Sequence, residues 1–304
     1  MKYMRSFKFL IPVLSLLVVA CHSNSNSNKV ETPKVIANKY SLAYQLEGKI
    51  VAANADTSKQ ISFGGATDPA VSPDGNMLAY TVSDSLGNRS IWVANMVSKS
   101  QVQLNVKSKN YYRAVWSPSG DRIAFSIFNK KSLWKVGIIK TDNSGYVMLD
   151  SVSKLSVYAP TWRNENQIIA QDLQKLYTFD LTGKVVGSVS ISDLIGKGFS
   201  VASNHNFFYS KDGKKLIFNA GNSDVLPGLN GPGEAVYVLD LASKQVKRIS
   251  PVGVSVPSLF VTANDKIIYS GMEKPFVVSK IYATDLSGSD IKVVVDKGNN
   301  PTAN

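Results

Sequence analysis

The feature that most constrains the fold of this chain is an internal repeat. Residues 69–75 read Pro-Ala-Val-Ser-Pro-Asp-Gly and residues 114–120 read Ala-Val-Trp-Ser-Pro-Ser-Gly, with their serines 45 residues apart. A short apolar run follows each copy, at residues 77–80 and 122–125. A fixed period of this length is typical of repeat architectures, in which each copy is one supersecondary unit that must pack on its neighbours.

Three weaker copies continue the series, at residues 160–170, 207–218 and 258–269. Each copy contains the first two strands of its unit, and downstream of it come a third, alternating segment and then a short fourth one. The third segments are residues 91–94, 133–136, 176–179, 236–239 and 281–284. Period-two alternation bounded by turn residues indicates β-strands. Each unit is therefore predicted to be a sheet of four antiparallel strands.

The first copy is incomplete, and the other end of the chain supplies what it lacks. Residues 41–44, 49–52 and 60–63 match strands two, three and four of the unit, but no first strand precedes them. Residues 298–303 echo residues 65–70, which lead into a first strand. Sharing one sheet between the termini hides its open edges. We therefore predict an all-β, six-bladed β-propeller closed by the C-terminal strand, spanning residues 36–304.

The repeat motif itself has a structural explanation. In Pro-Asp-Gly at residues 73–75, proline presets φ, aspartate caps the local backbone and glycine accepts positive φ, as a tight turn requires. Four tryptophans alternate with small or polar neighbours in the predicted strands: Trp92, Trp116, Trp134 and Trp162. We assign them to packing between blades rather than to a sugar-binding platform.

The N-terminal segment is predicted to be an export signal covering residues 1–20. Lys2, Arg5 and Lys8 precede an apolar run at residues 9–20 that is too short to span a bilayer. The segment ends in Leu-Val-Val-Ala-Cys, which resembles the bacterial lipobox, and the resemblance implies lipidation of Cys21. The alternative is a chance thiol at the end of an ordinary signal peptide.

Residues 21–35 then read as a lipidated, flexible tether, because serine and asparagine dominate them and cannot bury apolar surface. In lipoproteins, an aspartate directly after the lipidated cysteine commonly signals retention in the inner membrane, and His22 stands there instead. The resemblance therefore implies an outer-membrane lipoprotein that faces the periplasm, with display on the outer surface left open.

The repeat resembles the TolB-like β-propellers, whose units carry a Pro-x-Trp-Ser-Pro-Asp-Gly strand and turn, an apolar strand and an Ile-Trp/Tyr-Val strand. The resemblance spans about residues 40–304, and it is most specific at residues 69–96 and 114–136. It implies a propeller in the bacterial envelope. TolB's small α/β domain has no counterpart before residue 40, so the partner known for TolB is not carried over.

Composition removes several classes of chemistry. A single cysteine excludes a disulfide framework and a thiolate metal cluster, and two histidines, His22 and His205, cannot form a three-histidine zinc site. No nucleophile elbow is present, and the Asp-Gly pairs lack calcium-loop spacing. We predict no metal and no cofactor. The net charge of +12 is interpreted as a solvated basic surface, whose lysines and arginines cluster only at residues 107–113, 130–131 and 211–215.

Binding residues are expected where loops gather at the mouth of the central channel. In a propeller, the connections from strand four to the next strand one and from strand two to strand three emerge on one face, and loops on a rigid scaffold commonly carry function. The candidate ligand-binding residues at this mouth are Asp68, Tyr112, Arg113, Tyr158, His205, Asn206, Phe207 and Phe276. For Tyr112, Tyr158 and Phe207, simple packing against adjoining blades is an equally open interpretation.

The leading functional hypothesis is a monomeric, lipid-anchored propeller that binds an envelope protein or glycan without catalysing a reaction, and that does not bind nucleic acid. The alternative is a propeller enzyme, a lyase, lactonase or hydrolase acting on carbohydrate, with Asp68 and His205 as the suspected catalytic groups. A third possibility, a spacer within an envelope assembly, leaves the same pattern in the sequence.

Overall fold

A computed structural model describes residues 39–54, 60–149 and 154–304, which belong to one compact unit formed by residues 37–304. The predicted signal segment, Cys21 and the tether up to residue 35 lie outside the described residues. No helix among the residues described is long and apolar enough to cross a membrane.

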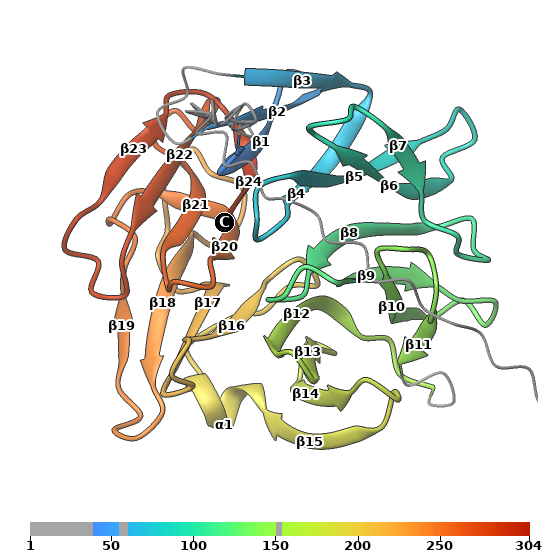
Figure 1. Cartoon of the computed structure of the whole chain (residues 1–304). Coiled ribbons are helices and arrows are strands. Elements are labelled where there is room, and N and C mark those ends of the chain that lie inside the picture. The colour runs from blue at the N-terminus through green and yellow to red at the C-terminus, as the bar shows by residue number, and fades with distance from the viewer. Residues whose placement is uncertain (1–38, 55–59, 150–153) are drawn as a thin grey trace, which may run out of the picture. The chain divides into compact units, whose positions relative to one another are not determined.

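The described residues form six four-stranded antiparallel sheets arranged as a ring (Figure 1). We number these blades 1 to 6 and give their strands from the centre outward. Blade 1 contains β24 (Asn299–Ala303), β1 (Leu42–Leu46), β2 (Lys49–Ala53) and β3 (Gln60–Gly64). Blade 2 contains β4 (Ala66–Val71), β5 (Met77–Ser83), β6 (Arg89–Asn95) and β7 (Gln101–Gln103). Blade 3 contains β8 (Tyr111–Trp116), β9 (Arg122–Phe128), β10 (Trp134–Lys140) and β11 (Val147–Leu149).

The remaining blades repeat this order. Blade 4 contains β12 (Tyr158–Asn164), β13 (Gln167–Gln171), β14 (Lys175–Asp180) and β15 (Val185–Ser190). Blade 5 contains β16 (Phe207–Tyr209), β17 (Lys215–Gly221), β18 (Glu234–Asp240) and β19 (Val246–Arg248). Blade 6 contains β20 (Ser255–Val261), β21 (Ile267–Met272), β22 (Ser279–Thr284) and β23 (Lys292–Val295). The predicted six-bladed propeller is confirmed.

The ring closes in blade 1, as the sequence predicts. There β24, from the C-terminus, pairs in antiparallel fashion with β1, so that Leu42 lies opposite Ala303 and Ala43 lies opposite Thr302. The backbone N–H of Asn304 donates to the carbonyl of Ser41 at 3.2 Å and extends the ladder by one residue. The inner edge of β1 is therefore paired rather than open.

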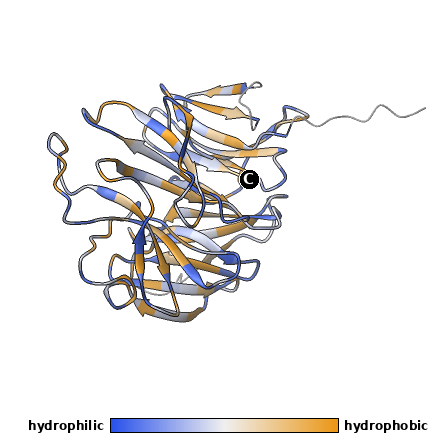
Figure 2. Ribbon diagram, turned by 90° about the vertical axis from the view of Figure 1, so that its left-hand side faces the viewer, coloured by the Kyte–Doolittle hydropathy of each residue, from blue (hydrophilic) through white to orange (hydrophobic). Residues whose placement is uncertain are grey.

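A hydrophobic cluster lies at each of the six interfaces between neighbouring blades. The closing interface is of the same kind as the others, because Leu42 and Ala303 of blade 1 pack with Ile268 and Ile281 of blade 6. Figure 2 shows the hydrophobic segments along the strands and many hydrophilic residues in the connections. Burial between blades thus holds the ring together, as expected for units that cannot bury their faces alone.

Two motif tryptophans join neighbouring blades by a hydrogen bond as well as by packing. Trp116 of blade 3 is buried, and its Nε1–H donates to the carbonyl of Ala70 in blade 2 at 2.8 Å. Trp162 of blade 4 repeats the contact with the carbonyl of Val115 in blade 3, at 3.0 Å. Both indoles are enclosed in interblade clusters, which agrees with the packing role predicted for them.

The motif serine closes the hairpin between the first two strands of a blade. Ser72 Oγ accepts from the N–H of Met77 at 2.9 Å, and Gly75 adopts a φ of 71° in the turn. In blade 6, where the motif is degraded, Thr262 Oγ1 accepts from the N–H of Lys266 at 3.2 Å and Asp265 takes the left-handed position with a φ of 62°. The turn is therefore preserved although its residues have changed.

Blade 4 is also regular despite losing the Ser-Pro-Asp-Gly turn. Its first two strands, β12 and β13, are joined by a shorter connection in which Asn164 Oδ1 accepts from the N–H of Asn166 at 2.9 Å. A one-turn helix not expected from the sequence, α1 (Ile191–Ile195), follows this blade. Ser190 Oγ accepts from the N–H of Asp193 at its start, and Ile191 and Ile195 are buried in the cluster between blades 4 and 5.

Candidate functional site

The two faces of the ring carry different connections. We call the loop face the side that carries the connections from strand four to the next strand one and from strand two to strand three. The turn face carries the connections from strand one to two and from three to four. Figure 1 shows the first strands of all six blades nearest the centre of the ring. A residue at the start of a first strand therefore lies near the centre of the loop face.

An irregularity recurs at this point in the first strands. The pairing register shifts at this point in β4, β8, β12, β20 and β24, as a β-bulge requires. Positive φ angles between 46° and 57° occur at the bulge in four of these strands, at Asp68, Arg113, Ala159 and Asn300. Since Ala159 has no functional group, the bulge itself is architectural. What differs between blades is the side chain it presents.

Asp68 and Arg113, predicted to lie at the channel mouth, are brought together from adjoining blades. Arg113 Nε lies 3.8 Å from Asp68 Oδ1, and the side chains are 37% and 18% exposed, respectively. The backbone N–H of Asp68 donates to Gln45 Oε1 and that of Arg113 donates to Thr81 Oγ1, each at 3.2 Å. The pair is thus fixed through the backbone, while the guanidinium keeps exposed donors for a ligand.

Asn300 occupies the equivalent bulge in blade 1, and it was missed by the sequence analysis. Its Nδ2 donates to Gln45 Oε1 at 2.5 Å, so Gln45 connects it to Asp68. The C-terminal strand lacks the motif serine from which the other positions are counted. The usable signal is the shared pattern of a polar residue before proline, in Asp68-Pro69 and Asn300-Pro301.

Tyr112 is engaged by neighbouring side chains. The Arg89 guanidinium carbon lies 3.6 Å from the centroid of the Tyr112 ring, and Trp134 contacts that ring edge-on at a centroid distance of 5.3 Å. Arg89 Nε also donates to Asn110 Oδ1 at 2.8 Å. A stacked arginine and an edge-on indole are a stabilising arrangement for a tyrosine ring. Tyr112 therefore helps to fix the connection that leads into β8.

His205 is held in a buried site between the connection that precedes β16 and the start of β18. It is 2% exposed, and its Nδ1 accepts from the N–H of Ala202 at 3.0 Å. Because Nδ1 accepts, the network assigns the neutral ring's proton to Nε2. Nε2 lies 3.1 Å from Glu234 Oε1, without the alignment of a hydrogen bond. His205 and Glu234 thus bring two elements of blade 5 into contact.

The two suspected catalytic residues of the enzyme hypothesis pair with different partners. Asp68, in blade 2, meets Arg113, whereas His205, at the entry to blade 5, meets Glu234. Within residues 39–54, 60–149 and 154–304, no group of three or more His, Cys, Asp or Glu side chains is placed to hold a metal ion.

The other predicted site residues lie in blades 4, 5 and 6 or in the connections that belong to them. Asn206 lies beside His205, and its N–H donates to Asn219 Oδ1 at 2.9 Å. Phe207 is 1% exposed and stacks on Phe218 within blade 5, which corresponds to the packing interpretation. Tyr158, at the start of β12, and Phe276, in the connection between β21 and β22, are half-buried. Ligand contact by the candidate residues remains a prediction.

The most exposed apolar side chains all lie on the loop face. Leu86, Val225, Val252 and Val277 are between 78% and 85% exposed, and all four lie in connections that belong to this face. No other large hydrophobic residue of the described chain exceeds 53% exposure. Sequence analysis did not single out these residues, although the topology alone places their connections on one side. The most exposed apolar groups of the described chain are therefore confined to one face of the ring.

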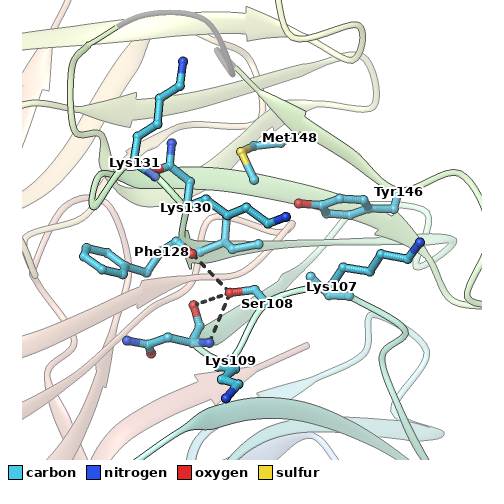
Figure 3. A pocket seen from close by; sticks show the side chains of 12 residues that line it. Lys107, Ser108, Lys109, Phe128, Lys130, Lys131, Tyr146 and Met148 are labelled. Carbon is cyan, nitrogen blue, oxygen red and sulfur yellow. Dashed lines mark hydrogen bonds between the residues drawn. The ribbon is translucent and has the colours of Figure 1, made fainter.

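A cavity of about 650 Å³ opens between blades 2 and 3, and we call it the lysine pocket (Figure 3). Its walls come from the connection before β8, through residues 106–110, and from the end of β9 with the connection after it, through residues 127–131. Tyr146 and Met148, in the outer part of blade 3, complete the walls. Two basic clusters that the sequence analysis interpreted as solvated surface therefore meet here. The signal that could have joined them is topological, because both fall in loop-face connections flanking one strand pair.

The fold matches solved structures, whereas no protein-family model and no curated protein matches the sequence. TolB from Acinetobacter baumannii is 14% identical, with a TM-score of 0.63 over 87% of this chain and 66% of that chain. A TolB from Agrobacterium tumefaciens is 11% identical, with a TM-score of 0.59 over 86% of this chain and 92% of that one. These likenesses confirm the predicted TolB-like propeller at the level of the fold.

The propeller domain of a protease has a similar fold. The β-propeller domain of the Trilobed protease from Pyrococcus furiosus is 16% identical, with a TM-score of 0.52 over 81% of this chain and 73% of that chain. That domain is described as having an open velcro topology, whereas β24 and β1 close the ring here. Because propellers of different function share this architecture, function must be argued from the site.

Proposed function

We propose that this TolB-like propeller is a non-catalytic binding module of the bacterial envelope, which holds a protein or glycan partner on its loop face. The proposal rests on the uneven distribution of the most exposed apolar residues between the two faces of the ring. Leu86, Val225, Val252 and Val277 all extend from that face, where solvent exposure of large apolar groups is unfavourable unless a partner covers them.

Arg113 supplies the polar part of the same surface. It is anchored through its backbone, it shares one contact with Asp68, and its side chain is only partly enclosed. Arginine is a common anchor in interfaces, because its planar donor array meets carboxylates, carbonyls or sugar hydroxyls with little loss of entropy. The partner is held by Arg113 at the centre and by apolar contacts around it.

We predict that Arg113→Ala reduces recovery of the partner about tenfold or more when the tagged protein is pulled down from solubilised envelopes. Arg122→Ala is a matched control, because Arg122 also pairs with an aspartate, Asp121 at 3.1 Å, but lies next to a connection of the turn face. Its partner recovery should equal that of the wild type. Equal recovery with Arg113→Ala, or equal losses with both variants, would count against the proposal.

The proposal includes a lipid anchor on Cys21, which would hold the propeller at the periplasmic side of the outer membrane through the polar residues that follow. It rests on the lipobox-like end of the N-terminal segment. Labelled palmitate should be incorporated into the wild-type chain and not into a Cys21→Ser variant, with both proteins produced in a bacterial host. Label retained by the variant would place the lipid elsewhere.

A further inference from the structure

The lysine pocket has a rim of uncompensated positive charge. Lys107, Lys109, Lys130 and Lys131 are exposed around it, and none of the residues that line it is acidic. Within the described part of the chain, none of the four forms an ion pair. Lys109 contributes weakly to the low pKa of the Asp84 carboxyl, which is held down mainly by a hydrogen bond from Asn88. Such a rim attracts an anionic group, because like charges held together without partners raise the local potential.

The interior of the pocket is mainly apolar. Val106, Ile127, Phe128 and Met148 line it together with the ring of Tyr146. Figure 3 shows Lys130 and Lys107 on the side of the Tyr146 ring, with Lys131 and Lys109 at opposite edges. The floor of the pocket therefore suits an apolar group, and its edge suits charge.

Two polar side chains of the interior, Ser108 and Asn110, already hold its walls. Ser108 Oγ donates to the carbonyl of Phe128 and accepts from the N–H of Asn110, each at 3.1 Å. Asn110 Oδ1 is taken by Arg89. These bonds connect the segment before β8 to the end of β9, so the pocket is built before any ligand arrives. A preformed cavity loses less entropy on binding than one that must be ordered.

We infer that the lysine pocket binds an acidic segment of a partner protein, which places one large apolar side chain on the floor and carboxylates against the rim lysines. A volume of about 650 Å³ accommodates a large side chain with part of its backbone, whereas a single phosphate would leave the apolar floor empty. A flat bilayer cannot reach a concave floor, and a nucleic acid requires a longer basic track than one pocket rim. The site is separate from the Asp68–Arg113 contact and goes beyond the proposed function.

The inference is tested with purified protein and a capped peptide, Asp-Glu-Phe-Asp-Glu, carrying a fluorescent label. Anisotropy at low salt should show saturable binding below about 1 mM, and raising the salt concentration should weaken it, because the rim charges are exposed. Replacing phenylalanine by alanine, or the acids by their amides, should each weaken binding about tenfold or more. No saturable binding up to about 1 mM, or equal binding of all three peptides, overturns the inference.

Charge variants separate the pocket from the net charge of the protein. Lys130→Glu combined with Lys131→Glu should abolish binding of the peptide. Lys211→Glu combined with Lys214→Glu makes the same change of charge in an exposed turn-face connection and should leave peptide binding within about twofold of the wild type. Equal losses of peptide binding in both double variants would show that the net positive charge of the protein, and not the pocket, attracts the peptide. That result would overturn the inference.

Two other ligands serve as competing outcomes in the same assay. Oligogalacturonate tests an anionic glycan and vesicles containing phosphatidylglycerol test a membrane surface. Tighter binding of either one, abolished by the Lys130 and Lys131 changes, would assign the pocket to that class instead and overturn the peptide inference. Because the assay contains no envelope partner, its failure would leave the proposed function of the loop face standing.

Discussion

Deleting residues 298–304 is expected to unfold the protein or to lower its stability by about 5 kcal/mol or more, which is comparable with the whole stability of an ordinary domain. The deletion removes β24, which pairs with β1 and places Ala303 in the cluster between blades 1 and 6. An open edge on β1 and an exposed apolar interface would remain. Urea unfolding followed by far-ultraviolet circular dichroism measures the change.

A synthetic peptide with the sequence of residues 298–304 provides the control for this deletion. Added to the shortened protein, it should restore part of the lost stability, with a midpoint that rises with peptide concentration, because binding only to the folded state shifts the equilibrium by mass action. A peptide of the same composition in scrambled order should have no effect. A shortened protein that unfolds at the wild-type midpoint would show that β24 does not close the ring.

Trp116→Ala should have the second largest effect, a loss of about 3–5 kcal/mol in the free energy of unfolding. The indole is buried between blades 2 and 3, and its removal leaves a cavity there and the carbonyl of Ala70 without its donor. Trp116→Phe keeps most of the volume and should lose about 1–3 kcal/mol, because a buried acceptor is left unpaired. Circular dichroism is the appropriate signal, since tryptophan fluorescence changes with the substitution itself.

Trp92→Phe is the matched control for the tryptophan series. Trp92 is half-buried, and its Nε1–H donates at 3.3 Å to Ser90 within the same strand instead of to the neighbouring blade. Trp92→Phe should lower the free energy of unfolding by less than about 1 kcal/mol. If Trp116→Phe and Trp92→Phe lower the free energy of unfolding equally, the hydrogen bond to Ala70 contributes nothing to the interface. The loss predicted for Trp116→Phe is then wrong.

The blade architecture could be predicted from sequence because the repeat records it at several levels. Alternation predicts the strands, Ser72 and Gly75 predict the hairpin turn, and the match between residues 298–303 and residues 65–70 predicts the closure. Even the degraded copy in blade 6 fits, since Thr262 and Asp265 take over the roles of serine and glycine. Local and global signals agree there, as they do in most well-folded sequences.

The candidate sites could be predicted only in part, because side-chain contacts between blades have no period. The entry positions were located by counting from the motif serine, which placed Asp68 and Arg113 correctly in adjoining strands. The partner of His205 was not predictable, since Glu234 lies at the far end of a long connection. Burial of Phe207 likewise depends on how Phe218 stacks.

The same limit explains why the lysine pocket could not be predicted from the sequence. Residues 107–110 and 130–131 read as two separate, solvated charge clusters in the sequence. They become one pocket because the connection before β8 crosses the end of β9, where Ser108 bonds to the carbonyl of Phe128. A charge pattern along the chain carries no information about such a crossing unless the order and direction of the strands are known first.

Photocrosslinking in living cells shows whether the partner binds on the loop face. A photoreactive amino acid is placed at Leu86, Val225, Val252 or Val277 on the loop face, and at Val97, Lys184, Lys244 or Ser289 in exposed connections of the turn face. We predict one crosslinked partner of constant mass from loop-face positions, and none from the turn face. Adducts formed only from the turn face, or equally from both faces, would contradict this prediction.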